Sequence, residues 1–108
     1  MDKINEYLKR TRIVHTDPDG WQCELPRKRL ECKDGFTISV QANKWTHSIP
    51  SIDGADEYTK VELGFPSEED ELIMDYARDP DLPTDTVYGY VPVEIVIKLI
   101  EKHGGIAN

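Results

Sequence analysis

The densest set of reactive side chains in the sequence is a run of carboxylates between residues 67 and 85. This stretch holds eight acidic residues and one basic residue, Arg78. The acidic residues are Glu68, Glu69, Asp70, Glu71, Asp75, Asp79, Asp81 and Asp85. A catalytic acid and its base need unlike environments to separate their pKa values, whereas these carboxylates are expected to share one exposed segment. We therefore interpret them as a candidate partner-binding surface that imitates a nucleic-acid backbone and occupies a basic groove on another protein.

The first four of these carboxylates also have a local explanation. Ser67 is a favourable N-cap residue, and acidic residues in a first helical turn are stabilised by the helix dipole. The pattern predicts a helix beginning at Ser67, with an apolar stripe of Leu72, Ile73 and Tyr76. Under this second interpretation, the acidic run is the solvated first turn of a helix. The sequence is compatible with both interpretations.

No other group of residues has the spacing of a known reactive site. Zinc sites usually contain close pairs of ligands, whereas Cys23, Cys32, His15 and His47 are dispersed. No serine or cysteine lies in a recognisable nucleophile motif. Gly104-Gly105 follows a predicted helix, and phosphate binds at the opposite end of a helix. We expect no metal, no cofactor and no catalytic residue.

The charge of the chain restricts its partners. The net charge is −8, and residues 35–108 carry 5 basic and 14 acidic residues. Nucleic acid and anionic membranes require a basic surface, so neither is an expected direct partner. The triplet Arg27-Lys28-Arg29 is the densest basic stretch, and an intramolecular contact with the acidic run explains it as well as a phosphate contact does. We expect a protein partner with a basic surface.

Length and composition fit one small domain in a reducing compartment. The chain has 108 residues and two cysteines, which is too few for a disulfide scaffold. The first residues contain no long apolar run of the kind found in signal peptides. No segment approaches the roughly 20 apolar residues that span a bilayer. We expect a cytoplasmic protein.

The periodicity of apolar residues predicts an α+β fold, with a small antiparallel sheet of about four strands packed against two C-terminal helices and a short N-terminal helix. Residues 1–28 are predicted to form an N-terminal helix and arm, and residues 29–108 the core domain. A type I′ turn at Asp34-Gly35 is expected to close a hairpin, and Gly104 to end the last helix. The expected helices are 2–12, a second from Ser67, and 92–103, and the expected strands are 21–25, 29–32, 36–42, 58–65 and 86–91.

Most of the chain from Leu30 onward resembles an uncharacterised family of small proteins encoded by bacteriophages and prophages. The residues that carry the resemblance are Cys32–Ala42 (CKDGFTISVQA), Val61–Ser67 (VELGFPS), Thr86–Glu94 (TVYGYVPVE) and Glu101–Gly105 (EKHGG). Members of this family often carry a cysteine and an arginine after the second hairpin strand, and Lys44–Pro50 lacks both. The resemblance implies a phage accessory gene acting in the cytoplasm of a bacterial host. It assigns no functional residue.

These observations lead to one expected function and two alternatives. The expected function is a non-enzymatic phage- or prophage-encoded binding protein that inhibits a nucleic-acid-targeting defence complex of the host, as anti-CRISPR proteins do. The first alternative is a phage housekeeping or assembly factor that acts as a homo-oligomer, for example a homodimer, through the exposed side of the last helix. The second is a small enzyme, or a protein that binds a metal or a nucleotide.

Overall fold

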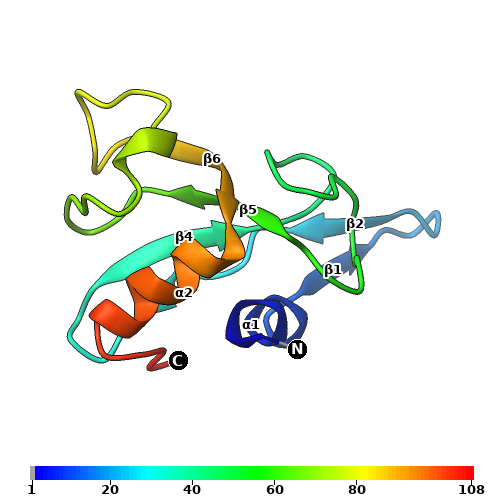
Figure 1. Cartoon of the computed structure of the whole chain (residues 1–108). Coiled ribbons are helices and arrows are strands. Elements are labelled where there is room, and N and C mark those ends of the chain that lie inside the picture. The colour runs from blue at the N-terminus through cyan, green and yellow to red at the C-terminus, as the bar shows by residue number, and fades with distance from the viewer. Residues whose placement is uncertain (1) are drawn as a thin grey trace.

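A four-stranded antiparallel sheet lies at the centre of the fold, which confirms the α+β class (Figure 1). The computed structural model describes residues 2–108. The sheet has the strand order β3-β4-β5-β6, so each strand pairs with its neighbour in sequence. Its strands are β3 (Leu30–Glu31), β4 (Thr37–Gln41), β5 (Lys60–Gly64) and β6 (Val87–Pro92). Two helices, α1 (Lys3–Arg10) and α2 (Val93–Lys102), complete the main body.

The alternation of apolar residues in the central strands produces one buried face. Ile38 and Val40 of β4 and Val61 and Leu63 of β5 are fully buried. The helices pack into the same core, α1 with Ile4, Tyr7 and Leu8, and α2 with Val93, Val96, Leu99 and Ile100. The boundary at residue 28 stays a prediction, but α1 shares its core with the sheet instead of standing apart from it.

The hairpin of β3 and β4 is closed by a three-residue loop. The Gly35 amide donates to the Cys32 carbonyl at 3.0 Å, and the Cys32 amide donates to the Phe36 carbonyl at 2.8 Å. Gly35 has a φ of +96°, whereas Asp34 has a negative φ. The predicted type I′ turn is wrong, because that turn requires a positive φ at both central residues. The loop instead leaves the Asp34 side chain free to point toward α2.

The end of α2 follows the prediction closely. Gly104 has a φ of +91°, and its amide donates to the Glu101 carbonyl at 3.1 Å. The Gly105 amide donates to the Ile100 carbonyl at 2.9 Å, which completes a Schellman motif. This motif turns the chain back at His103.

The predicted helix beginning at Ser67 does not form. Ser67 pairs with the start of β4, since its amide donates to the Thr37 carbonyl at 2.8 Å and its hydroxyl accepts from the Thr37 amide at 3.0 Å. The Asp70 carboxylate accepts from the Leu72 amide at 3.0 Å and thereby replaces a helical hydrogen bond. Only a short 3-10 helix, η1 (Met74–Tyr76), follows. The sheet therefore has one C-terminal helix instead of two.

A separate two-stranded ribbon precedes the sheet. It consists of β1 (Ile13–Thr16), which the sequence did not predict, and β2 (Gln22–Leu25). A turn at residues 17–20 joins them, and the Gly20 amide donates to the Asp17 carbonyl at 3.0 Å. Figure 1 shows the ribbon projecting away from the sheet. Across residues 2–108, no helix combines the length and the apolar character needed to cross a membrane.

Candidate functional site

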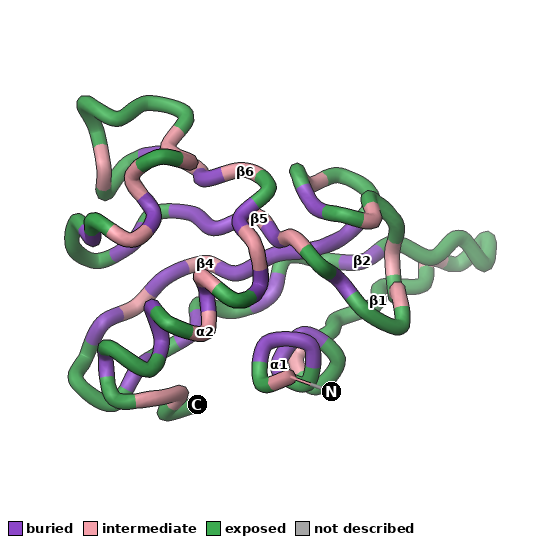
Figure 2. Tube along the Cα trace, viewed as in Figure 1, coloured by how far each residue is buried: buried purple, intermediate pink, exposed green. Residues whose placement is uncertain are grey.

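The eight predicted binding carboxylates divide into seven exposed residues and one buried residue. Glu68, Glu69, Glu71, Asp75, Asp79, Asp81 and Asp85 are exposed, whereas Asp70 is 4% exposed. Six of the exposed residues lie on two irregular loops at one end of the molecule, on either side of η1, and Asp75 lies in η1 itself (Figures 1 and 2). We call these seven residues the acidic surface. Asp70 does not belong to it.

Asp70 is instead part of a buried cluster around His103. The Nε2 atom of His103 lies 3.1 Å from Asp70 Oδ2, and Nδ1 lies 2.7 Å from Asp34 Oδ2. The Nζ atom of Lys102 lies 3.1 Å from Asp70 Oδ2. We call these four residues the His103 clamp. It joins the end of α2 to the β3–β4 loop and to the start of the acidic surface.

The geometry determines the protonation state of His103. A carboxylate only accepts hydrogen bonds, so each ring nitrogen that faces one must carry a proton. Burial opposes this charge, but the hydrogen bonds that the ring donates to Asp34 and Asp70 outweigh it and raise the pKa of His103. Burial likewise opposes the charge on Asp70, while hydrogen bonds from the Leu72 amide, His103 and Lys102 lower its pKa. A hydrogen bond from the Phe36 amide, followed by the contact with His103, lowers the pKa of Asp34.

The clamp has the character of a structural element. Both ring nitrogens of His103 are occupied by protein carboxylates, and the Phe36 ring stacks on the imidazole with a centroid distance of 4.0 Å. A histidine that exchanges protons with a substrate needs a free nitrogen within hydrogen-bond reach of it. Within the described chain, His103 has no such nitrogen. It fixes the first of the two loops that carry the acidic surface.

The second loop of the acidic surface is fixed to β6. The Arg78 amide donates to the Val87 carbonyl at 2.9 Å, and the Asp79 amide donates to Thr86 Oγ1 at 3.0 Å. The Tyr88 hydroxyl donates to the Pro83 carbonyl at 2.5 Å. These contacts close the loop at its base and leave Asp79, Asp81 and Asp85 on the outside. The backbone of this loop is therefore held in place before any partner binds.

Two of the three residues of the basic triplet make contacts within the protein. Arg27 has a side chain that is 1% exposed, and its Nη1 atom lies 2.7 Å from Glu24 Oε1. Its guanidinium also donates to the Leu8 carbonyl at 3.0 and 3.1 Å. Arg29 contacts Thr37 Oγ1 and the Phe65 carbonyl instead of a carboxylate. The expected contact between the triplet and the acidic run is therefore wrong for these two arginines.

The cysteines and histidines considered as metal ligands lie in different places. His15 and Cys23 are opposite one another in the β1–β2 ribbon, and both are exposed. Cys32 is buried, and burial followed by the charge of Asp34 raises the pKa of its thiol to about 11. His47 lies beside Glu62, with Nδ1 3.4 Å from Oε2. Within residues 2–108, no three His, Cys, Asp or Glu side chains are arranged to hold a metal ion.

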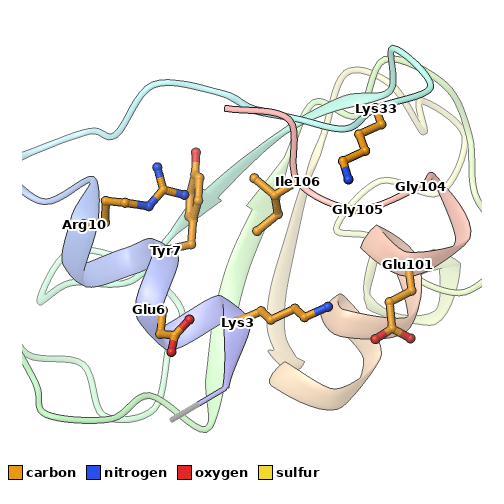
Figure 3. Close-up of a pocket in the computed structure, with 9 residues that line it drawn as sticks. All are labelled: Lys3, Glu6, Tyr7, Arg10, Lys33, Glu101, Gly104, Gly105 and Ile106. Carbon is orange, nitrogen blue, oxygen red and sulfur yellow. The ribbon is translucent and has the colours of Figure 1, made fainter.

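A shallow groove of about 470 Å³ lies between α1 and the turn after α2 (Figure 3). Lys3 and Lys33 extend into it from opposite sides. Arg10 also lines it, but its Nη2 atom donates to the Asn108 carbonyl at 3.1 Å. Glu6 from α1 and Glu101 from α2 bring carboxylates to the same groove. With both signs of charge on its walls, the groove does not select a ligand of either sign.

Sequence reasoning did not find the His103 clamp. Asp34 is 69 residues from His103, and Asp70 is 33 residues from it, so no local spacing marks the three as partners. His103 fitted a helix C-terminus, where a positive side chain is favourable. Asp34 fitted a turn, and Asp70 fitted an acidic helix start. Each residue therefore had a sufficient local explanation.

Comparison with known proteins adds no further assignment to this site. No model of a known protein family matches the chain, and neither does any curated protein or any solved structure.

Proposed function

We propose that the protein is a non-enzymatic binding protein whose acidic surface occupies a basic, nucleic-acid-binding groove on a partner. The observation that supports this most is the fixed placement of the seven exposed carboxylates. The His103 clamp holds one loop, and the contacts of β6 with Arg78, Asp79 and Pro83 hold the other. A prearranged set of charges binds with a smaller loss of conformational entropy than a flexible acidic tail.

The charge of the chain favours the same partner class. A carboxylate array attracts a Lys- and Arg-lined channel and speeds the encounter with it. The resemblance to phage-encoded proteins supports a partner in a bacterial host and favours a nucleic-acid-targeting defence complex. The protein would then act as an inhibitor of the anti-CRISPR type by competing with nucleic acid for the channel.

The test is a charge reversal that spares the clamp. Glu68, Glu69 and Glu71 are exposed, so replacing all three with lysine leaves Asp70 in place. Each change adds two charges, and the net charge rises from −8 to −2. The matched control replaces Glu31, Asp56 and Glu57, which are also exposed acidic residues, with lysine and produces the same net charge.

The measurement is capture of proteins from a bacterial host lysate by the wild-type chain and by both variants, followed by competition with single-stranded DNA and RNA. We expect the wild type and the control to retain a partner that nucleic acid displaces, and the surface variant to lose it. Equal loss in both variants would show that only overall charge matters. Retention in the surface variant would show that another face binds.

A homo-oligomeric assembly factor that uses α2 is less well supported. The exposed residues of α2 and its C-terminal turn are Glu94, Lys98, Glu101 and Lys102. Charged residues at this spacing are typical of a solvated helix face. The apolar surface suited to self-association lies elsewhere.

A further inference from the structure

The β1–β2 ribbon exposes an apolar face. In the ribbon register, Ile13 lies opposite Leu25 and His15 lies opposite Cys23. Residues directly opposite one another in antiparallel strands share a face, so these four side chains point the same way. Trp21, whose carbonyl accepts from the Asp17 amide at 2.9 Å, extends this face by one more pair. Ile13 is 37%, Leu25 40% and Trp21 77% exposed.

Unlike the strands of the four-stranded sheet, this ribbon has no third element of the described chain packed against its apolar face. An isolated two-stranded ribbon is marginally stable in water and needs packing against a third element. All four residues of β1 are exposed, and Glu24 is the only buried residue of β2. Figure 2 shows the outer part of the ribbon as exposed except at Asp17, which has intermediate burial. Only its base is held, through the contacts of Glu24 with Arg12 at 2.9 Å and with Arg27 at 2.7 Å.

The apolar face carries almost no free charge, in contrast to the rest of the chain. The single charged residue of the two strands is Glu24, which is buried and paired with two arginines. Asp17, which pairs with Trp21, is the one acidic residue beside this face, and its Oδ1 atom accepts from the amides of Asp19 and Trp21 at 3.0 and 2.9 Å. A basic partner attracted by the acidic surface therefore finds little that is complementary here.

The position of the ribbon also suits association between identical chains. The molecule is 44 Å long, and the ribbon and the acidic loops lie at opposite ends (Figure 1). Charges separated by more than about 8 Å are largely screened at physiological salt. Two copies joined through their ribbons thus keep their acidic surfaces apart, so the net charge of −8 on each copy opposes the contact only weakly.

We propose that this face binds a second copy of the same chain, with the two ribbons packed face to face around a twofold axis. Each copy supplies an identical, largely apolar face, as a twofold interface requires. The packing removes Trp21, Ile13 and Leu25 from water and covers the exposed face of each ribbon. Only a few side chains take part, so we expect a weak dimer whose population rises with protein concentration. The two acidic surfaces remain exposed at the outer ends of the dimer.

The two tryptophans provide a matched test. Trp21 and Trp45 are both 77% exposed, but only Trp21 lies on the ribbon. Sedimentation equilibrium of the full chain is expected to show a monomer–dimer equilibrium for the wild type and for Trp45→Ser. Trp21→Ser is expected to raise the dimer dissociation constant at least about tenfold, as loss of a central aromatic contact does. Circular dichroism verifies that both variants are folded.

Cys23 provides an independent readout on the same face. It is exposed in the monomer, whereas Cys32 is buried. Dimerisation is expected to slow the alkylation of Cys23 by maleimide as protein concentration rises, and Trp21→Ser is expected to remove this protection. A wild-type chain that is monomeric at high concentration overturns the proposal. If that monomer loses capture of a host protein on Trp21→Ser, the ribbon binds a different protein, and the second-copy proposal is equally wrong.

Discussion

His103 Nε2 lies 3.1 Å from Asp70 Oδ2, a contact that joins the end of α2 to the first acidic loop. The other ring nitrogen faces Asp34, so the imidazole is held between two carboxylates from different segments. A protonated ring satisfies both acceptors, whereas a neutral ring can donate to only one of them. The stability of the acidic surface is therefore coupled to the charge on a single buried histidine.

The first prediction concerns the pH dependence of stability. The folded-state pKa of His103 is raised above the ordinary value of about 6.5. A raised pKa stabilises the fold fully below the unfolded-state pKa, and this contribution is lost as the pH rises through the folded-state pKa. We expect the free energy of unfolding, measured with urea, to fall as the pH rises above about 6.5 and through the folded-state pKa of His103. His103→Gln should make the free energy of unfolding less dependent on pH in this range.

A proton-detected titration of the histidines checks the assignment. The reference is the ordinary histidine value of about 6.5. We expect the His103 ring to titrate above this value in the folded wild type. A His103 ring that titrates at or below it contradicts the doubly protonated clamp.

The second prediction separates Asp70 from its acidic neighbours. Asp70→Asn leaves the buried ring donor of His103 and the partly exposed amine of Lys102 with a weaker acceptor, so we expect a loss of about 1–3 kcal/mol in the free energy of unfolding. Glu71→Gln changes an exposed residue and is expected to alter it by no more than about 0.5 kcal/mol. Chemical denaturation at neutral pH measures both. Equal effects would place Asp70 on the surface.

The third prediction concerns the ion pair at the base of the ribbon. Arg27→Met leaves the Glu24 carboxylate buried with only Arg12 as a partner, and this is expected to cost about 3–5 kcal/mol. The double variant Glu24→Gln/Arg27→Met removes both charges and should recover part of that loss. Urea denaturation of the single and double variants gives the comparison. A double variant no more stable than Arg27→Met would show that the hydrogen bonds of Arg27 to the backbone dominate.

The fourth prediction concerns Gly104, which positions His103. At a φ of +91° a side chain is strained, and an added Cβ atom lies 3.3 Å from Lys33 Cβ. Gly104→Ala is therefore expected to cost about 1–2 kcal/mol. Gly64→Ala is the control, because Gly64 lacks a positive φ and an added Cβ atom finds its nearest neighbours at 3.7 Å. Thermal unfolding should show a clearly lower midpoint for Gly104→Ala than for Gly64→Ala.

The fifth prediction concerns the two thiols. A buried thiol with a pKa raised to about 11 is almost entirely protonated at neutral pH and is a poor nucleophile. We expect a disulfide reagent to modify Cys23 in the folded monomer and Cys32 only after denaturation. Counting modified thiols by mass spectrometry before and after adding guanidinium tests this. Rapid modification of Cys32 in the folded protein would show that the Cys32 region opens easily.

The sequence by itself determined the elements whose signals are local. Alternating apolar residues predicted β4 and β5, and the apolar face of 92–103 with Gly104 behind it predicted α2 and its cap. Composition also located the excess of acidic residues correctly, and seven of the eight predicted residues are exposed. These features depend on periodicity, backbone preference and charge, all of which act over a few residues.

Only the tertiary structure decided the conformation and the contacts of the acidic run. Local preference favoured a helix from Ser67, but pairing with Thr37 and the contacts of Asp70 with His103 and Lys102 replaced it. The buried pair of Glu24 and Arg27 could not be predicted for the same reason. Charged residues close together in a sequence are usually interpreted as solvated, and only the fold shows that these two are buried. A buried charge is stable only beside a partner, and for the clamp that partner lies far away in the sequence.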